Sequence, residues 1–172
     1  MSGGRPMKRT AVASPHHSAR PAGVTPRVIV LHADAAKDAT ASVSWIKSKE
    51  SKVSYHALVD RDGTVYTFVD PSRKAWHCGV SEYQGVQNVN DFSLGLSFAN
   101  ICDGVELYTH AQYEAGADVV REWMALYPTL SVEHITTHEA TALPAGRKHD
   151  PGPLFRLDYF LGLIDGSKDV AE

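Results

Sequence analysis

A short loop near the end of the chain places three chemically different side chains on consecutive residues. Lys148, His149 and Asp150 supply an amine, an imidazole and a carboxylate, and Pro151 and Gly152 follow directly. The Pro-Gly pair ends regular secondary structure and fixes the local backbone, so this loop could hold reactive side chains in place. Clusters of charge beside proline and glycine are also typical of solvated surface turns. The loop alone leaves both interpretations open.

Histidines elsewhere in the chain could complete a metal site with this loop. His32 ends an apolar, β-branched run, and His138 ends the run Ile-Thr-Thr. A helix would place His134 and His138 on one face, but β-branched residues favour a strand and the H-E-x-x-H pattern of helical zinc sites is absent. Two strand-terminal histidines and Asp150 make a three-ligand set that suits zinc with an open fourth position. The spacing signal is weak, because a histidine at a strand end is more often a hydrogen-bonded core residue.

The elements that must position these residues alternate between short strands and helices. Apolar and β-branched runs predict strands at 28–31, 53–59, 64–69 and 92–100, the second and third joined as a hairpin, and apolar periodicity predicts helices at 40–52, 109–127 and 154–164. We therefore expect an α/β fold: a single domain with a mixed central β-sheet packed by about three helices. The candidate ligands would meet at the end of the strands that carry His32 and His138.

Composition limits the class of protein. With 172 residues, 43% of them hydrophobic and 22% charged, the chain is large enough for one globular domain with a real core. A formal net charge of -3 gives no electrostatic reason to expect nucleic-acid binding, and no apolar run is long enough to span a bilayer. Two cysteines, Cys78 and Cys102, are too few for a disulfide framework, so we expect free thiols, although one bridge remains open.

The two ends of the chain are expected to lie outside the folded domain. Residues 1–26 hold four prolines, four Lys or Arg residues and no acidic residue. This pattern predicts a flexible, basic, Pro-rich tail, followed by a domain at 27–166 and a frayed C-terminus at 167–172. The tail is either a disordered leader or a basic arm for an anionic surface such as a cell wall. No apolar segment typical of a signal peptide follows, which favours a cytoplasmic location.

Two further regions carry side chains that could line a groove. Tyr55 and His56 are neighbours on a predicted strand, so they point to opposite faces and one of them can face the site. Trp76, His77 and Asn90 belong to a long loop whose aromatic, imidazole and amide groups suit a groove for a sugar or a peptide. A purely structural Trp-His pair explains the first two nearly as well.

Seven segments carry a resemblance to a known family, in the same order along the chain. They are Val28–His32, Ser54–His56, Arg61–Gly63, Ala75–Ser81, Asn90–Gly95, Thr137–His138 and Gly146–Gly152. Together they resemble the zinc-dependent N-acetylmuramoyl-L-alanine amidases of type 2, a family that includes muropeptide-recycling amidases, phage endolysins and peptidoglycan-recognition proteins. The resemblance covers about residues 27–160 and implies an enzyme that hydrolyses the amide bond between N-acetylmuramic acid and L-alanine.

Carried over residue by residue, the resemblance implies a role for each candidate. His32, His138 and Asp150 would bind Zn2+, which activates water and polarises the scissile carbonyl. Lys148 would stabilise the oxyanion as negative charge develops. Residues expected to contact the substrate, which is bacterial peptidoglycan or its muropeptides, are Trp76, His77, Asn90 and His56.

One departure from the family pattern decides between its branches. Ser97 occupies the position at which recycling amidases carry a catalytic Glu, and serine cannot act as a base at neutral pH. Short phage lysozymes of the family also lack the Glu and use a Tyr before the hairpin His, as in Tyr55-His56 here. The resemblance therefore implies Tyr55 and Lys148 as the catalytic pair.

This departure favours a phage or prophage endolysin that lyses cell walls. Such a protein would be a monomer and would stay cytoplasmic until another protein released it to the wall. The first alternative is a cytoplasmic recycling amidase that acts on anhydro-muropeptides. The second alternative, from another class, is a peptidoglycan-recognition module without catalysis.

Overall fold

A six-stranded mixed sheet forms the centre of the computed structural model, which describes residues 6–169. Its strands, in spatial order, are β1 (Arg9–Ala11), β5 (Val65–Thr67), β4 (Ala57–Val59), β9 (Ser93–Phe98), β3 (Val28–Ala33) and β10 (Ile135–Thr137). Strands β4, β9, β3 and β10 run parallel to one another, while β5 and β1 run in the opposite direction. The parallel strands therefore end at one edge of the sheet.

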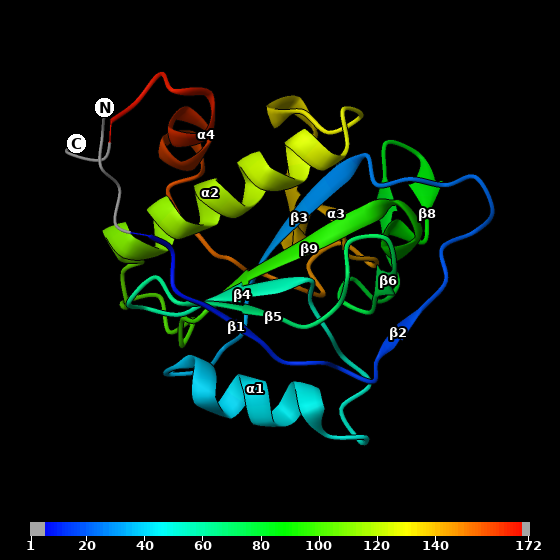
Figure 1. The fold of residues 1–172 in the computed structure, drawn as a ribbon, viewed down its shortest axis with the longest axis horizontal. Helices are drawn as coiled ribbons and strands as arrows, with labels where there is room; N and C mark the ends of the chain where they lie inside the picture. Colours follow the sequence, from blue (N-terminus) through cyan, green and yellow to red (C-terminus); the bar gives the residue numbers. More distant parts are fainter. Residues whose placement is uncertain (1–5, 170–172) are drawn as a thin grey trace.

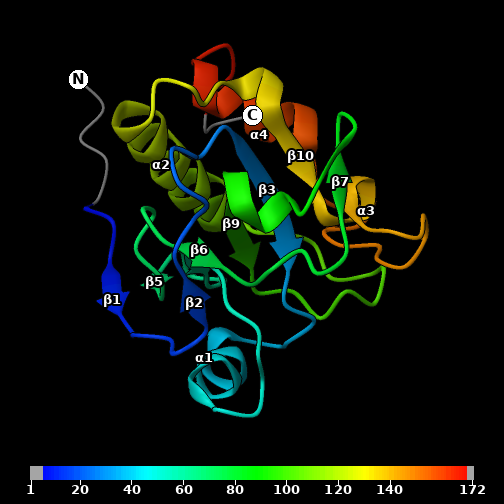
Figure 2. The ribbon, with the colours of Figure 1, turned by 90° about the vertical axis from the view of Figure 1, so that its right-hand side faces the viewer.

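Helices cover both faces of this sheet. Helix α1 (Ala39–Lys47) lies on one face, and α2 (His110–Leu126) and α4 (Leu157–Asp165) pack together on the other (Figures 1 and 2). Shorter elements are α3 (His138–Thr141), the 3-10 helices η1 (Val89–Phe92) and η2 (Val132–His134), and the strand pairs β2 (His17–Ser18) with β6 (Lys74–Ala75) and β7 (Glu82–Tyr83) with β8 (Val86–Gln87). The expected α/β domain with a mixed sheet and three main helices is confirmed.

The central strands are buried on both faces, as their β-branched sequences predict. All six residues of β3 are buried, and its side chains alternate between two clusters. Ile29 and Leu31 join the core formed with α2 and α4, whereas Val28 and Val30 pack in a separate cluster on the other side. His32 continues the alternation of Val28 and Val30, so its ring points away from α2 and α4.

Several element boundaries differ from the predicted ones because other contacts use the same backbone. Helix α1 ends at Lys47, where Ser48 caps it, rather than at residue 52. Strand β4 begins at Ala57 rather than at residue 53; before it, the Ser54 N–H donates to the Trp76 carbonyl outside the sheet, and the His56 N–H donates to the Gly95 carbonyl of β9. Helix α2 begins after Thr109, the expected N-cap, whose hydroxyl accepts from the Gln112 N–H in a capping box.

The prediction of a flexible N-terminal tail is wrong for residues 6–26. Strand β1 pairs with β5 and extends the sheet, and β2 pairs with β6. Arg20 inserts its guanidinium among four backbone carbonyls, those of Pro71, Asn90, Asp91 and Ser93. Composition indicated a solvated basic segment, but its backbone fills an edge of the sheet and its arginine satisfies carbonyls of the domain. The first five residues of the predicted tail lie outside the described part.

The end of α4 is fixed by a hydrogen bond from the segment that follows it. The Lys168 N–H donates to the Gly162 carbonyl at 3.0 Å and so caps the end of α4; fraying of the described residues 167–169 stays a prediction. Residues 170–172 of the predicted frayed segment lie outside the described part. Between residues 6 and 169, no helix combines the length and the apolar character needed to cross a bilayer. Cys78 is buried, Cys102 is exposed, and both are free thiols.

Candidate metal centre

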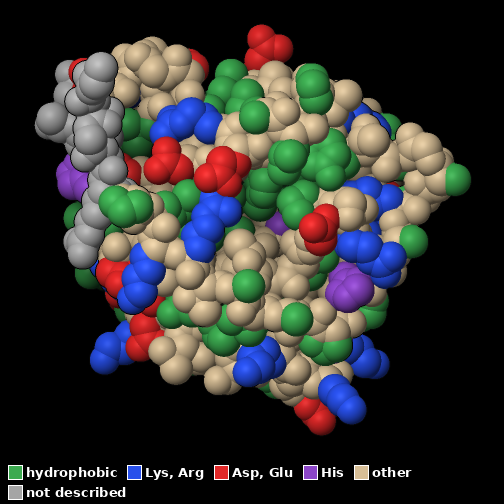
Figure 3. Space-filling view, in the orientation of Figure 1, with side chains coloured by type: hydrophobic (Ala, Val, Ile, Leu, Met, Phe, Trp, Pro, Cys, Tyr) green, Lys and Arg blue, Asp and Glu red, His purple; other side chains and the backbone are tan. Residues whose placement is uncertain are grey.

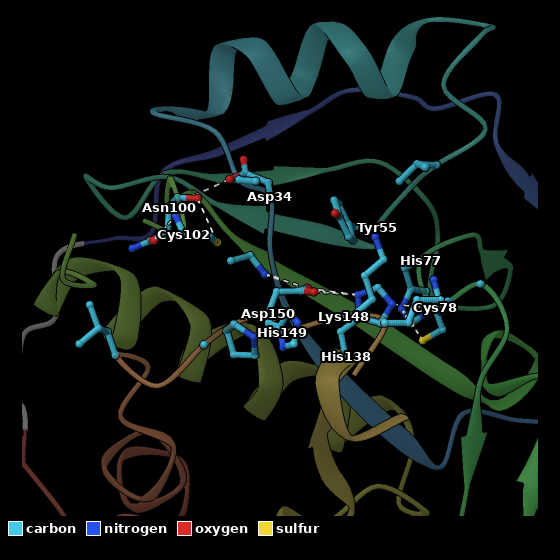
Figure 4. A pocket seen from close by; sticks show the side chains of 18 of the residues that line it. Asp34, Tyr55, His77, Cys78, Asn100, Cys102, His138, Lys148, His149 and Asp150 are labelled. Carbon is cyan, nitrogen blue, oxygen red and sulfur yellow. Dashed lines mark hydrogen bonds and ion pairs between the residues drawn. The ribbon is translucent and has the colours of Figure 1, made fainter. Parts of the chain in front are cut away.

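Three predicted ligands from distant parts of the chain converge at one edge of the sheet. His32 lies near the end of β3, His138 begins α3 directly after β10, and Asp150 lies on the loop between α3 and α4. Their ligand atoms lie within 4.8 Å of one another (Figure 4). His32 Nδ1 is 3.4 Å and His138 Nδ1 is 3.1 Å from the Asp150 carboxylate oxygens. The structure thus brings together the set expected from the strand ends.

Strand pairing positions the two histidines. Because Thr137 of β10 is in register with Leu31 of β3, the residues that follow them, His138 and His32, are side by side. The chain turns into α3 at His138, where Thr137 caps the helix by accepting from the Ala140 N–H. His138 is therefore the first residue of a helix rather than the last residue of a strand, and the expected position at the sheet edge is unchanged.

Backbone hydrogen bonds hold Asp150 against these elements. The Ala33 N–H at the end of β3 donates to Asp150 Oδ2 at 3.3 Å, and the Glu139 N–H of α3 donates to the Asp150 carbonyl at 3.1 Å. The loop that carries Asp150 is thus attached to both elements that carry the histidines.

The hydrogen bonds of His138 indicate that a cation fits this site. Its Nε2 lies 3.1 Å from the Cys78 carbonyl, which can only accept, so Nε2 carries the hydrogen. In the neutral ring Nδ1 then has a lone pair, and it faces the Asp150 carboxylate. Two acceptors at this distance need a proton or a metal ion between them. Two imidazole nitrogens and a carboxylate oxygen are also a donor set that binds zinc.

The protonation states suit metal binding. Burial lowers the pKa of His32 to about 4, so its ring is neutral at pH 7 and its nitrogen lone pair is available. Burial alone would raise the pKa of Asp150, but the rings of His138 and His32 outweigh it and hold that pKa below its usual value. The carboxylate is therefore ionised near neutral pH.

A second group of potential ligands lies behind His32. It consists of His32, His77 and Cys78, all buried. Burial raises the pKa of the Cys78 thiol, whereas metals bind the thiolate. The ring nitrogen of His77 is already engaged with His32 Nε2 at 2.8 Å. This group is therefore a poorer metal site than the one formed with Asp150.

A cleft of about 660 Å³ opens over the candidate centre. The labelled side chains in Figure 4 show Tyr55, Lys148, His138 and Asp150 arranged around the same space. On the face shown in Figure 3, basic and acidic side chains are interspersed rather than gathered by sign. The volume is typical of small-ligand sites, which span roughly 300–1,000 Å³.

Tyr55 is the member of the Tyr55-His56 pair that faces the cleft. Its ring centroid is 5.2 Å from that of His32. Burial first, and then the charge of Asp150, raise the pKa of the Tyr55 phenol, and the nearby Ser97 hydroxyl opposes this shift only in part. The phenol is therefore protonated at neutral pH. Lys148 is exposed and also lines the cleft.

The prediction that His56 contacts the substrate is wrong, since its ring lies on the other face of the sheet. His56 is 1% exposed; its Nδ1 accepts from the Gly95 N–H at 2.9 Å, and its Nε2 lies 2.9 Å from the Arg73 carbonyl. His77 borders the cleft but is buried, and its ring nitrogens face His32 and Ser93. Both nitrogens are thus used inside the protein, and contact between His77 and the substrate stays a prediction.

Trp76 and Asn90 do line the cleft, but each is also tied to the protein. The Trp76 Nε1–H donates to Ser18 Oγ at 3.1 Å, which connects the cleft wall to the N-terminal segment. Asn90 Oδ1 accepts the N–H groups of His77 and Cys78 at 3.3 and 2.9 Å. Their contact with substrate stays a prediction, and their structural role is to shape the wall.

Two residues of the site were not singled out from the sequence. Asp34 borders the cleft two residues after His32; burial raises the pKa of its carboxyl to about 6, and Ser42 and Asn100 donate to it. Arg147, inside the recognised loop, donates to the Cys78 and Val80 carbonyls. Proximity to His32 and Lys148 was the only sequence signal for them.

Ser97 is fully buried on β9, in register with His32.

These features define a three-layer α/β domain with a candidate His-His-Asp metal centre at the floor of an open cleft. Comparison with known proteins gives the family. The sequence profile described as N-acetylmuramoyl-L-alanine amidase matches residues 22–153, and the chain belongs to this family. It is an N-acetylmuramoyl-L-alanine amidase.

Individual relatives agree with this assignment. The 1,6-anhydro-N-acetylmuramyl-L-alanine amidase AmpD of Escherichia coli K12 is 33% identical over 172 residues, covering 89% of this chain and 90% of that protein. A crystal structure of a Se-Met AmpD derivative superposes with a TM-score of 0.74 at 32% identity, covering 92% of this chain and 94% of that one. The E. coli amidase AmiD, in complex with the substrate anhydro-N-acetylmuramic acid-L-Ala-D-gamma-Glu-L-Lys, superposes with a TM-score of 0.70 at 27% identity over 84% and 60% of the chains.

Proposed function

We propose that this amidase depends on zinc and cleaves the bond between the N-acetylmuramic acid moiety and L-alanine in soluble anhydro-muropeptides. The observation that carries the proposal is the convergence of His32, His138 and Asp150 in a chain that matches amidases of this type over about nine tenths of its length. These relatives are named for anhydro-muropeptide substrates, and they favour the recycling alternative over the endolysin function expected from Tyr55 and Ser97.

Zinc bound by His32, His138 and Asp150 would act as a Lewis acid on the scissile carbonyl and make water a stronger nucleophile at neutral pH. The protein would supply the remaining functions. The Tyr55 phenol, held in its protonated form, can accept a hydrogen bond from the attacking water or donate one to a substrate oxygen. The Lys148 ammonium can stabilise the oxyanion from the same cleft.

The loss of the catalytic Glu does not exclude the recycling function. Ser97 lies beside Tyr55, and a half-buried tyrosine whose ring lies 5.2 Å from that of His32 can orient water without a carboxylate at position 97. We therefore keep Tyr55 and Lys148 as the proposed catalytic pair and change the proposed substrate. A cytoplasmic location remains part of the proposal, while release to the cell wall is no longer needed. That the enzyme is a monomer stays a prediction.

Substrate class can be tested by offering intact sacculi and soluble anhydro-muropeptides to the zinc-loaded enzyme in separate reactions. Mass spectrometry should detect free stem peptide and the anhydro sugar at much the higher rate from the soluble substrate. Cleavage of sacculi with no turnover of soluble muropeptides would restore the endolysin assignment. Tyr55→Phe in both reactions separates true hydrolysis from contaminating activity.

A further inference from the structure

His32 contacts a second buried imidazole on the side opposite Asp150. His32 Nε2 and His77 Nδ1 are 2.8 Å apart, and the two rings meet edge to face at an interplanar angle of 81°. Two nitrogens at this distance share one hydrogen, since two lone pairs or two N–H groups would repel. The location of that hydrogen determines which nitrogen of His32 is available to a metal.

The surroundings of the two rings decide its location. If His77 donated to His32 Nε2, the single hydrogen of a neutral His32 would lie on Nδ1 and occupy the space toward Asp150. If His32 donates, its Nδ1 lone pair faces Asp150 at 3.4 Å, which matches the arrangement at His138. His77 then carries its own hydrogen on Nε2, which can donate to Ser93 Oγ at 3.1 Å. Only this second arrangement leaves both histidines ready to bind one cation.

The backbone around His77 is built to hold its ring in this place. A Cβ atom on Gly95 would lie 2.7 Å from Cγ and Nδ1 of His77, so only glycine allows the imidazole to lie against β9. Asn90 Oδ1 holds the backbone of the same loop by accepting the N–H groups of His77 and Cys78. His77 is 5% exposed, and its ring is fixed by packing as well as by hydrogen bonds.

We propose that His77 is a positioning residue: it accepts the His32 Nε2–H and thereby fixes the ring orientation and tautomer that direct His32 Nδ1 to the metal. Ser93 fixes His77 in turn, and Gly95 makes room for it. The inference rests on the proposed zinc site and extends it, because outer partners of metal-binding histidines commonly set ligand orientation and affinity. Neither Ser93 nor His77 touches the substrate in this role.

The test compares zinc affinity in His77→Leu and His77→Asn, measured by competition with a chromophoric chelator. Leucine fills space but cannot accept a hydrogen bond, so zinc should bind roughly 10- to 100-fold more weakly. Asparagine places Oδ1 close to the former Nδ1 and should recover most of that loss. Thermal melting of the metal-free variants controls for folding. A purely structural role would lower the melting temperature while the zinc Kd stayed within about twofold of wild type, and that result would overturn the proposal.

A second measurement keeps the proposal testable if His77→Leu fails to fold. Long-range 1H–15N correlation spectra of the zinc-loaded wild-type protein report which nitrogen of each histidine carries a hydrogen. The expected result is His32 protonated on Nε2 and metal-bound through Nδ1; protonation on Nδ1 would contradict it. Wild-type protein that binds no zinc would instead defeat the proposed function. Zinc binding that is equal in wild type and a folded His77→Leu defeats only the role of His77.

Discussion

The ring of His32 separates two regions that are both rich in histidine but differ in chemistry. On the cleft side, His32 Nδ1 faces Asp150 and lies beside His138. On the packed side, its Nε2 faces His77, and the ring of His56 lies 6.0 Å beyond that of His77. Only the cleft side combines imidazoles with a carboxylate and an open space. The difference shows that the partners of a histidine, more than its residue type, decide whether it can bind a metal.

The largest expected effect comes from removing a candidate metal ligand on the cleft side of His32. Asp150→Ala removes one of three protein ligands and should abolish both zinc retention and hydrolysis. Metal content after dialysis and turnover of anhydro-muropeptide measure the two losses. Glu139→Ala is the matched control, because this neighbouring carboxylate is exposed and, among residues 6–169, its ion-pair partner is His149 at 3.9 Å. Full zinc content in Asp150→Ala would place the metal elsewhere.

A second change on the cleft side should separate metal binding from catalysis. Tyr55→Phe removes the phenol oxygen and leaves the ring beside His32, so zinc should be retained while kcat falls by about 10²-fold or more. Steady-state kinetics and metal analysis of the same preparation give both values. Turnover equal to wild type would remove Tyr55 from the proposed pair.

Substitutions in the N-terminal segment, away from both sides of His32, should change stability rather than chemistry. Arg20→Ala takes a guanidinium away from four backbone carbonyls, including those of Asn90 and Ser93, and should cost roughly 3 kcal/mol of unfolding free energy. Arg9→Ala removes the exposed pair with Glu122 and a weak contact with Met7 and should cost less than about 1 kcal/mol. Denaturant unfolding compares them, and equal small losses would show that the N-terminal segment does not support the domain.

The smallest effect on turnover is expected from a change at Ser97, which lies at the boundary between the two sides of His32. Ser97→Ala removes a buried hydroxyl beside Tyr55 and should keep kcat within about twofold of wild type, equivalent to roughly 0.4 kcal/mol. An inactive, folded Ser97→Ala variant would mean that the serine, not only the tyrosine, has replaced the missing Glu.

The sequence predicted the cleft side far better than the packed side. His32, His138 and Asp150 could be found because strand ends and a Pro-Gly loop are local signals, and parallel strands bring such ends together. The alternation of Tyr55 and His56 predicted opposite faces, but the choice of face depends on where β9 and α1 pack. The contact between His77 and His32 was not predicted, because the two residues lie 45 positions apart in sequence.

The N-terminal segment was misjudged for a related reason. Its composition resembles that of a disordered tail, yet β1 is held by backbone hydrogen bonds to β5, which residue types do not encode. The sequence predicts that Arg20 is a solvated charge. In the fold, its guanidinium is surrounded by backbone carbonyls from three later segments. Long-range partners of this kind become visible only when the topology is known.

Zinc content of the purified wild-type enzyme tests the central claim most directly. Inductively coupled plasma mass spectrometry, after dialysis against metal-free buffer, should find about one zinc per chain, as expected for a site with three protein ligands. Titration with a strong chelator should remove the metal and the hydrolytic activity together, and added zinc should restore both. An enzyme that cleaves muropeptides at full rate with no zinc bound would contradict the account.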